Sequence, residues 1–347
     1  MNLTWTKLEP IPDPIHGLPC ARSSHGLSVV NNGRCLILYG GEHVARTPIE
    51  SASSCWALDV DTNVWRLINA TTNSPPIRIA HAQAVHNDQN VYVFGGRAGI
   101  TMEEKAMNDL WKLDASGEPG TEKWTQIFPQ TDIIPEARSF HRMLCIGDSL
   151  FVFGGCGQVS GRLNDLYRFD LNAMTWHLLG NAALRGRGGP NLLSLGSGNN
   201  LAVVAGFAGE ETCDGQAFDI SKSMWNKEML STGLQGMRPR SVSVAASFPN
   251  TGIALIFGGE VDPSDRGHEG AGGFENDIVI LDEKTGALKE TILSANSGNW
   301  PGPRGWSAGD AHEDSNGGSQ LFLFGGLSGD DENPTRLNDL WRLEIAC

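Results

Sequence analysis

Short hydrophobic runs that end in glycine return at regular intervals along the 347-residue chain. Each run holds four or five apolar residues between turn-forming residues, which is typical of a buried β-strand. The spacing between successive runs is 51 to 67 residues, and this self-similarity predicts a fold made of repeated units. The runs are LILYGG, VYVFGG, LFVFGG, LAVVAG, ALIFGG and LFLFGG, ending at Gly41, Gly96, Gly155, Gly206, Gly259 and Gly326.

Two further strand patterns follow the glycines in most repeats. The first reads NDLWKLD at residues 108–114, NDLYRFD at 164–170 and NDLWRLE at 338–344. The second is an alternating strand centred on Trp65, Trp124, Trp176 or Trp225. Six repeats of this composition resemble kelch repeats. That resemblance implies that each repeat is one four-stranded blade of a β-propeller.

The two ends of the chain complete one repeat between them. The sixth repeat stops after residues 338–344 and lacks a tryptophan strand, while residues 3–8, LTWTKL, have the missing alternation. We therefore expect the N-terminal segment to pair with the strand at 337–343 as the outer strand of the last blade, which removes an open sheet edge. The prediction is an all-β, six-bladed kelch β-propeller closed by an N-terminal outer strand, with residues 1–347 as a single domain.

The composition of the chain limits the kinds of molecule that it is expected to bind. The formal net charge is −14 and only 19% of residues are charged, which argues against nucleic acids and anionic membranes as ligands. No apolar stretch has the length of a signal peptide core or a membrane span, and seven cysteines without a CxxC pair favour reduced thiols. We expect a cytoplasmic protein that takes a small-molecule substrate, and the sequence leaves a homodimer open.

One face of the propeller should carry the function. The first two strands of a blade form a hairpin, so the start of the first and the end of the second lie on the same face. Longer connections follow the second strand at residues 42–54, 97–107, 260–275 and 327–336. Arginines on this face could bind an anionic ligand or an acidic partner segment, or could pair with neighbouring carboxylates as architectural residues. These ring arginines, one per blade, are Arg22, Arg78, Arg138, Arg187, Arg240 and Arg304.

Residues directly after the glycines differ between repeats, so the scaffold does not explain them. Glu42, Arg97 and Glu260 are the predicted catalytic residues of a pocket rim, where Arg97 would hold an oxyanion and a glutamate would move a proton. Phe207 and Leu327 are the predicted apolar wall. Trp306 could stack on a ligand or belong to the core. The histidines three places after the ring arginines, His25, His81 and His141, could act as a base or make structural hydrogen bonds.

The fifth repeat carries an acidic loop, GGEVDPSDRGHEG, after its strand. Carboxylates and a histidine so close together can hold Fe(II), Mn(II) or Zn(II). Several motifs here resemble the plant specifier proteins of glucosinolate breakdown, namely ARSSHG at 21–26, FGGR at 94–97, EARSFH at 136–141 and RGRGG at 185–189. The resemblance implies an iron site of the form Glu-x-x-x-Asp-x-x-x-His. Glu260 and His268 match its ends, Ser264 departs from it in the middle, and Asp265, one residue later, or Asp262 could substitute.

Two function classes follow. The first is a small-molecule enzyme of specialised metabolism that binds a reactive intermediate and steers its cyclisation, rearrangement or fragmentation, as a specifier-like lyase, an isomerase, a cyclase or a pericyclase. No redox cofactor motif is present, and we expect no required cofactor, with a divalent metal such as Fe(II) at Glu260, Asp265 and His268 as the open exception. The alternative is a kelch scaffold that binds an acidic segment of a partner protein.

Overall fold

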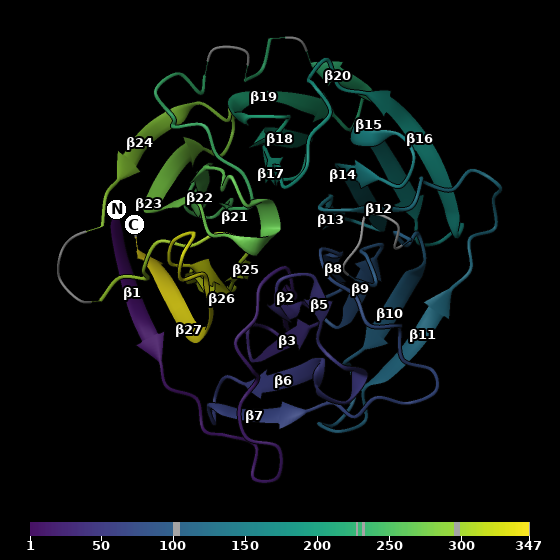
Figure 1. Ribbon diagram of the computed structural model, residues 1–347. Coiled ribbons are helices and arrows are strands. Elements are labelled where there is room, and N and C mark those ends of the chain that lie inside the picture. Colours follow the sequence, from purple (N-terminus) through teal and green to yellow (C-terminus); the bar gives the residue numbers. More distant parts are fainter. Residues whose placement is uncertain (100–104, 227, 231–232, 295–298, 347) are drawn as a thin grey trace.

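Six antiparallel sheets surround a common axis, and the innermost strands of neighbouring sheets contact each other all the way round the ring (Figure 1). The computed structural model describes residues 1–99, 105–226, 228–230, 233–294 and 299–346, and of His268 it describes the backbone alone. The chain is thus an all-β, six-bladed propeller, as the repeats predict. Within the described ranges no helix has the length and hydrophobicity needed to cross a membrane.

Blades one to three follow the sequence outwards from the axis. Blade one contains β2 (Gly26–Val30), β3 (Cys35–Tyr39), β6 (Cys55–Asp59) and β7 (Val64–Leu67), with the small hairpin β4 (Glu42–Val44) and β5 (Thr47–Pro48) and the 3-10 turn η1 (Ser51–Ser53) between β3 and β6. Blade two contains β8 (Ala82–His86), β9 (Asn90–Phe94), β10 (Leu110–Asp114) and β11 (Lys123–Ile127). Blade three contains β12 (Arg138–Ser139), β13 (Arg142–Ile146), β14 (Ser149–Gly157), β15 (Gly161–Asp170) and β16 (Thr175–Asn181).

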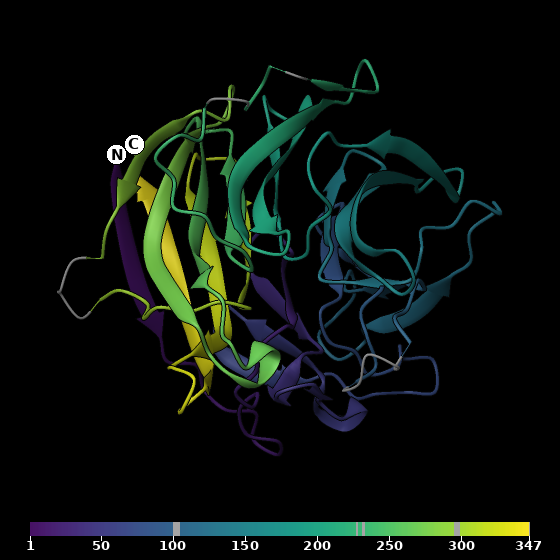
Figure 2. The same ribbon diagram turned by 45° about the horizontal axis from the view of Figure 1, so that its top comes forward.

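Blades four and five repeat the same order, whereas the outermost strand of blade six comes from the N-terminal segment; an oblique view shows the outer strands curving round the disc (Figure 2). Blade four contains β17 (Asn191–Leu195), β18 (Asn200–Phe207), β19 (Glu211–Asp219) and β20 (Met224–Asn226). Blade five contains β21 (Val244–Phe248), β22 (Ile253–Asp262), β23 (Gly273–Asp282) and β24 (Leu288–Ile292), with the 3-10 turn η2 (Gly267–Glu269) between β22 and β23. Blade six contains β25 (Ala308–Glu313), β26 (Ser319–Ser328), β27 (Thr335–Ala346) and β1 (Asn2–Leu8).

The closure of blade six is the predicted one. Strand β1 pairs antiparallel with β27, from Asn2 opposite Ala346 to Leu8 opposite Leu340, and the two chain ends lie side by side (Figure 1). The indole ring of Trp5 is 3% exposed and packs against the ring of Phe257 in the neighbouring blade. The N-terminal strand therefore both completes one sheet and seals the interface between blades five and six.

The hydrophobic core lies between the blades rather than in one central mass. Buried side chains form six clusters, and each fills one interface between neighbouring sheets. Phe151 of blade three, for example, shares a cluster with Leu192 of blade four. Because every sheet is covered on both faces, the strands read as continuous apolar runs instead of simple alternations.

The glycine at the end of each run allows the inner strand to approach closely. At Gly259 the backbone φ is +104°, and a Cβ there would lie 2.5 Å from the carbonyl oxygen of Ser241. The register between the second and third strands shifts at this point in blades three to six, and the hairpin then continues. The long loops expected at 260–275 and 327–336 are therefore shorter, because strand pairing extends to Asp262 and Ser328 before the chain turns.

Candidate functional site

Residues after the glycines share one face with the starts of the inner strands. In every blade the post-glycine residue pairs with the residue that follows the ring arginine, as in the bridge between Ser241 and Glu260. This agrees with the face chosen from the hairpin argument. The six pairs are Ser23 with Glu42, Ile79 with Arg97, Ser139 with Cys156, Gly188 with Phe207, Ser241 with Glu260, and Gly305 with Leu327.

A cavity of about 410 Å³ opens at this face, and we call it the mouth pocket. The structure brings together on its wall five of the predicted residues, which are Glu42, Arg97, Phe207, Glu260 and Trp306. Leu327 does not belong to the wall. Its side chain is 3% exposed and outside the lining, and blade six contributes Trp306 there instead.

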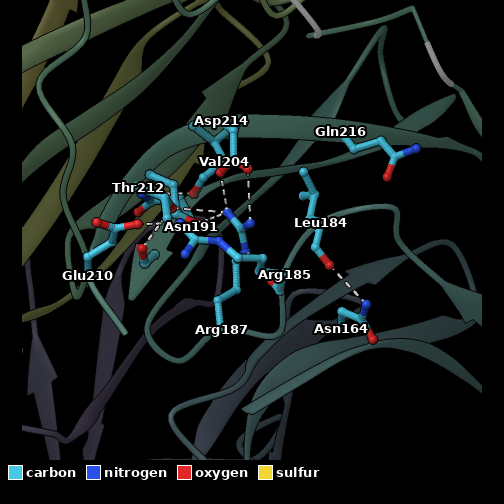
Figure 3. Close-up of polar contacts among 12 residues, drawn as sticks. Asn164, Leu184, Arg185, Arg187, Asn191, Val204, Glu210, Thr212, Asp214 and Gln216 are labelled. Atoms are coloured by element: carbon cyan, nitrogen blue, oxygen red, sulfur yellow. Dashed lines mark hydrogen bonds and ion pairs between the residues drawn. The ribbon is translucent and has the colours of Figure 1, made fainter. Parts of the chain in front are cut away.

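The ring arginines do not reach the mouth pocket, which corrects their prediction as substrate-binding residues. Each is at most 3% exposed, and its guanidinium points into its own blade. Arg187 shows the arrangement, donating to both carboxylate oxygens of Asp214 at 2.6 and 3.2 Å and to the carbonyl of Ala205 at 3.0 Å (Figure 3). The same bidentate pair recurs as Arg78 with Asp109, Arg138 with Asp165, Arg240 with Asp277, and Arg304 with Asp339.

Blade one departs from this pattern. Arg22 lacks a carboxylate partner among the described residues and donates to the carbonyl oxygens of Gly40 at 3.0 Å and Ser54 at 3.2 Å. Burial lowers the pKa of Arg22, whereas the pKa of Arg78 is raised because Asp109 compensates for burial. In all six blades, then, the arginine ties two strands together and is turned away from the mouth pocket.

The histidines are also structural. His25 and His141 share Nε2 hydrogen bonds of 3.1 Å with the carbonyls of Phe324 and Phe94, each in the preceding blade. Burial holds the pKa of both imidazoles well below the ordinary value and lowers that of His81 to about 3. All three side chains are therefore neutral at physiological pH. His25 and His141 join neighbouring blades by hydrogen bonds, whereas the ring of His81 packs against the ring of Tyr39 in blade one, with centroids 5.2 Å apart.

Glu42 is anchored on the pocket wall by several donors. Its Oε1 accepts from the hydroxyls of Ser23 at 3.2 Å and Ser24 at 3.3 Å and lies 3.7 Å from Nη2 of Arg336. Its Oε2 accepts from the backbone N–H of Arg46 at 2.5 Å. Burial raises the pKa of this carboxyl, and the charge of Arg336 opposes that rise.

Glu260 of blade five has a different environment on the pocket wall. It extends from the end of β22 and is 6% exposed. Burial first, and then the charge of Glu211, raise the pKa of Glu260 to about 8. Glu211 accepts a hydrogen bond of 3.1 Å from Ser241 Oγ, and burial raises its own pKa to about 7. The Glu260 carboxyl therefore keeps its proton to a higher pH than an ordinary glutamate does.

Two arginine side chains, Arg97 of blade two and Arg162 of blade three, lie on the same side of the pocket. Arg97 makes no ion pair with a described residue, and its buried Nε has no hydrogen-bond partner among them. Arg162, at the start of β15, stands over the ring of Phe207 with its guanidinium carbon 4.6 Å from the centroid. Both arginines act to lower the pKa of the Cys156 thiol, which burial raises, so they flank the same point on the wall.

Sequence reasoning missed Arg46 and Arg162 as wall residues. Arg162 follows Gly161 at a hairpin tip and belongs to no repeated motif. Its position beside Phe207 depends on packing between blades three and four, which one repeat alone does not encode. The available signal was an isolated cation at the tip of a hairpin on the functional face.

The described donors of the blade-five loop do not fit the three-ligand iron site that the resemblance implies. Ser264 occupies the middle position, and its hydroxyl donates to Asp331 of blade six. Asp265 is exposed, while the His268 side chain lies outside the described residues. Across the described part of the chain, no three His, Cys, Asp or Glu side chains gather as a metal-binding group. The described side chains of this loop therefore supply acid–base and hydrogen-bonding groups, but not a complete ligand set.

The fold and the mouth pocket together define a kelch-repeat propeller with a cavity that combines a largely apolar wall with a few charged residues. The chain belongs to the KLHDC2/KLHL20/DRC7 Kelch-repeats domain family, whose model matches residues 1–127 and 29–259. It also resembles a specifier-type protein along nearly its whole length. It is 25% identical to N-(sulfonatooxy)prop-2-enimidothioate sulfolyase of Thlaspi arvense over 93% of this chain and 92% of that protein.

Other relatives are larger proteins of which this chain matches a part. Acyl-CoA-binding domain-containing protein 4 of Arabidopsis thaliana is 28% identical over 66% of this chain, which spans 30% of that protein. Adagio protein 3 of the same plant is 29% identical over 66% of this chain and 37% of its own length. These matches support the repeat fold, while the match to the sulfolyase extends to the whole propeller.

Proposed function

We propose that the mouth pocket binds a small organic anion and promotes a non-redox lyase or isomerase reaction, such as its fragmentation, rearrangement or cyclisation. The observation that carries this proposal is the meeting of Arg97, Glu260 and Phe207 on one cavity of about 410 Å³. Ligand sites commonly combine an apolar wall with a few convergent polar groups, and carboxyls with shifted pKa values cluster at such sites.

The roles follow from the surroundings of each residue. Arg97, with Arg162 beside it, would hold the negative charge of the ligand and the charge that develops in the transition state. Glu260 would give a proton to a departing or rearranging group, because its raised pKa lets it keep its proton to a higher pH than an ordinary glutamate does. Glu42 is less suited to proton transfer, since three hydrogen-bond donors and the charge of Arg336 already engage its oxygens.

The similarity to a sulfolyase supports a lyase-type reaction. The relative's name describes an anionic, sulfonatooxy-bearing substrate, whose charge an arginine-lined pocket could complement. The absence of a matching middle ligand at Ser264 is the main difference from the iron-dependent mechanism that the resemblance implies. We therefore propose that positioning and electrostatic stabilisation, rather than a metal, carry the reaction.

The test supplies freshly prepared N-(sulfonatooxy)prop-2-enimidothioate and follows its products by gas chromatography and mass spectrometry. We expect the chain to change the product distribution relative to buffer, and Arg97→Ala to lower turnover by roughly 10²-fold, as losing one charge-stabilising donor does elsewhere. The melting temperature of Arg97→Ala should stay near wild type, because Arg97 makes no ion pair with a described residue. Unchanged products, together with no saturable binding of organic anions, would exclude the proposal.

A chelator separates the metal-independent mechanism from the iron-dependent one. Activity that survives EDTA supports the first. Activity lost with EDTA and restored by Fe(II) would show that the reaction depends on a metal and would overturn the metal-independent mechanism, including the role of Glu260 as the acid.

A scaffold that binds an acidic segment is the second candidate. It is favoured by one observation, the presence of Arg46, Arg97 and Arg162 on the wall of a solvent-open cavity. Fluorescence anisotropy with acidic peptides tests it directly. Tight peptide binding that Arg97→Ala abolishes, together with no chemical conversion of any small anion, would favour the scaffold over the enzyme.

A further inference from the structure

Six residues, one from each blade, form a closed ring of backbone hydrogen bonds around the propeller axis. Each lies two places after a ring arginine, and its N–H donates to the carbonyl of the corresponding residue in the preceding blade. We call this set the axial ring. Its bonds run from Ser24 to Trp306 (2.9 Å), Ala80 to Ser24 (2.8 Å), Phe140 to Ala80 (2.9 Å), Gly189 to Phe140 (2.8 Å), Val242 to Gly189 (2.9 Å) and Trp306 to Val242 (3.0 Å).

Every residue of the axial ring has a left-handed backbone conformation. Gly189 has φ +57° at no steric cost, which shows that glycine satisfies the scaffold at this position. Phe140 at +55°, Trp306 at +50° and Val242 at +47° adopt the same conformation against their own preference. A bulky or β-branched residue with positive φ is a genuine outlier, and such strain concentrates at functional sites.

The three strained residues differ from Ser24 and Ala80 because they themselves line the mouth pocket. Phe140, Val242 and Trp306 line it together with Gly189. Ser24 and Ala80, the remaining ring members, contact only a smaller cavity of about 30 Å³ beneath the ring. Glycine would satisfy the scaffold at these positions, yet Phe140, Val242 and Trp306 place bulky side chains at the base of the mouth pocket. Hydrogen bonds to both neighbouring blades hold the backbone of each one.

We propose that Phe140, Val242 and Trp306 form the selectivity floor of the mouth pocket and fix the size of the apolar part of its ligand. The ligand would place a flat apolar face on this floor and its anionic group towards Arg97 and Arg162. This inference rests on the proposed function, because it assumes that the mouth pocket takes an organic anion. Phe140 and Val242 thereby become specificity residues that the sequence alone did not indicate.

The local packing explains why the floor is rigid. Val242 leans over Gly189, where an added Cβ would lie 2.6 Å from Val242 Cγ1. Trp306 meets the ring of Phe274 edge to face, with centroids 5.9 Å apart. Since neither side chain stands alone in solvent, shortening one should enlarge the pocket without releasing the backbone ring.

The experiment compares two anions of different size, benzenesulfonate and 8-anilinonaphthalene-1-sulfonate, by titration calorimetry on the full chain. We expect Trp306→Ala and Val242→Ala to change the ratio of the two dissociation constants by at least about fivefold in favour of the larger probe. Alanine is compatible with the ring, because Ala80 already has φ +52° there. Val242→Ala should keep the wild-type melting temperature or exceed it, since it removes a β-branched residue from a strained position.

Two controls separate this inference from the proposed function. Arg97→Ala should weaken both probes by a similar factor and leave their ratio unchanged, because both carry a sulfonate. Ala80→Gly alters the axial ring away from the mouth pocket and should also leave the ratio unchanged. An unchanged ratio in both Trp306→Ala and Val242→Ala would overturn the selectivity floor alone, whereas a wild-type chain that binds neither probe would overturn the proposed function as well.

Discussion

Two sets of positions lie next to each other on the functional face and have opposite characters. The ring arginines are identical in all six blades, and every one is buried against its own sheet. The post-glycine residues vary between the blades, and Glu42, Arg97 and Glu260 among them line the mouth pocket. In this propeller the ring arginines, which recur in every blade, hold the blades together. The post-glycine residues, which differ from blade to blade, are available to contact a ligand.

The comparison also shows why charge alone misleads. A ring of six arginines at an opening suggests an anion site, but each guanidinium is already satisfied by strand carbonyls and, in five blades, by an aspartate. Arg97 differs because it extends from the end of a strand rather than from its beginning. Position within the blade, more than residue type, decides which arginine can meet a ligand.

The largest expected change in melting temperature comes from removing one of the ring arginines. Arg240→Ala leaves Asp277, 7% exposed, as a buried carboxylate without its partner. Loss of one partner from a buried pair costs roughly 3–5 kcal/mol, so the melting temperature should fall by about 10 °C. Thermal unfolding followed by circular dichroism measures it.

Arg22→Ala is the matched control for that prediction, because no described aspartate pairs with Arg22 and would be left without its partner. It should lower the melting temperature by clearly less than Arg240→Ala does. Equal losses from the two variants would mean that the carbonyl contacts, and not the ion pair, account for the stability of the ring arginines.

A smaller effect is expected from Glu260, and it depends on pH. The folded-state pKa of about 8 lies above the ordinary value of 4.5, so the carboxyl favours the folded state at low pH, and this contribution is lost as the pH rises through 8. The wild-type melting temperature should therefore fall by roughly 5 °C between pH 5 and pH 9. Glu260→Gln should flatten most of that slope, leaving the part due to Glu211. A variant with the wild-type slope would show that Glu260 ionises normally.

The smallest effect is expected on the opposite face. Asp148 lies in the turn between β13 and β14 and bonds the imidazole of His86 at 2.9 Å, but the carboxylate is exposed. Asp148→Asn keeps an acceptor oxygen, so binding of benzenesulfonate should be unchanged and the melting temperature should move by no more than about 2 °C. A loss of anion binding as large as that caused by Arg97→Ala would show that the ligand binds on the opposite face of the disc from the mouth pocket.

The fold was accessible from the sequence because each blade is a local unit whose strands follow one another along the chain. The closing strand was accessible for a related reason, since residues 3–8 supply the pattern that the last repeat lacks. Hairpin geometry then placed Glu42, Arg97 and Glu260 on one face. The extent of the hairpins was wrong, because pairing beyond the glycines depends on register shifts at Gly259 and its equivalents.

The remainder of the site depends on contacts between blades. Arg162 reaches Phe207 across the interface of blades three and four, and Glu211 acts on Glu260 from the adjacent blade. The left-handed conformation of Val242 and Trp306 is equally invisible in a sequence, because glycine is the residue that normally marks it. Such features arise from the assembled ring, and periodicity along the chain carries no information about them.

The pairing of β1 with β27 has a consequence for how the molecule is made. Residues 2–8 are synthesised long before their partners at 335–346, so the sheet of blade six can close only after the other five blades have been made. Until then the side chain of Trp5 and the apolar face of blade five that it covers both remain exposed to solvent. Contacts of such sequence separation form slowly, and unpaired strand edges promote association between molecules. A nascent chain of this protein is therefore most vulnerable to aggregation while the strand at 335–346 has yet to be made.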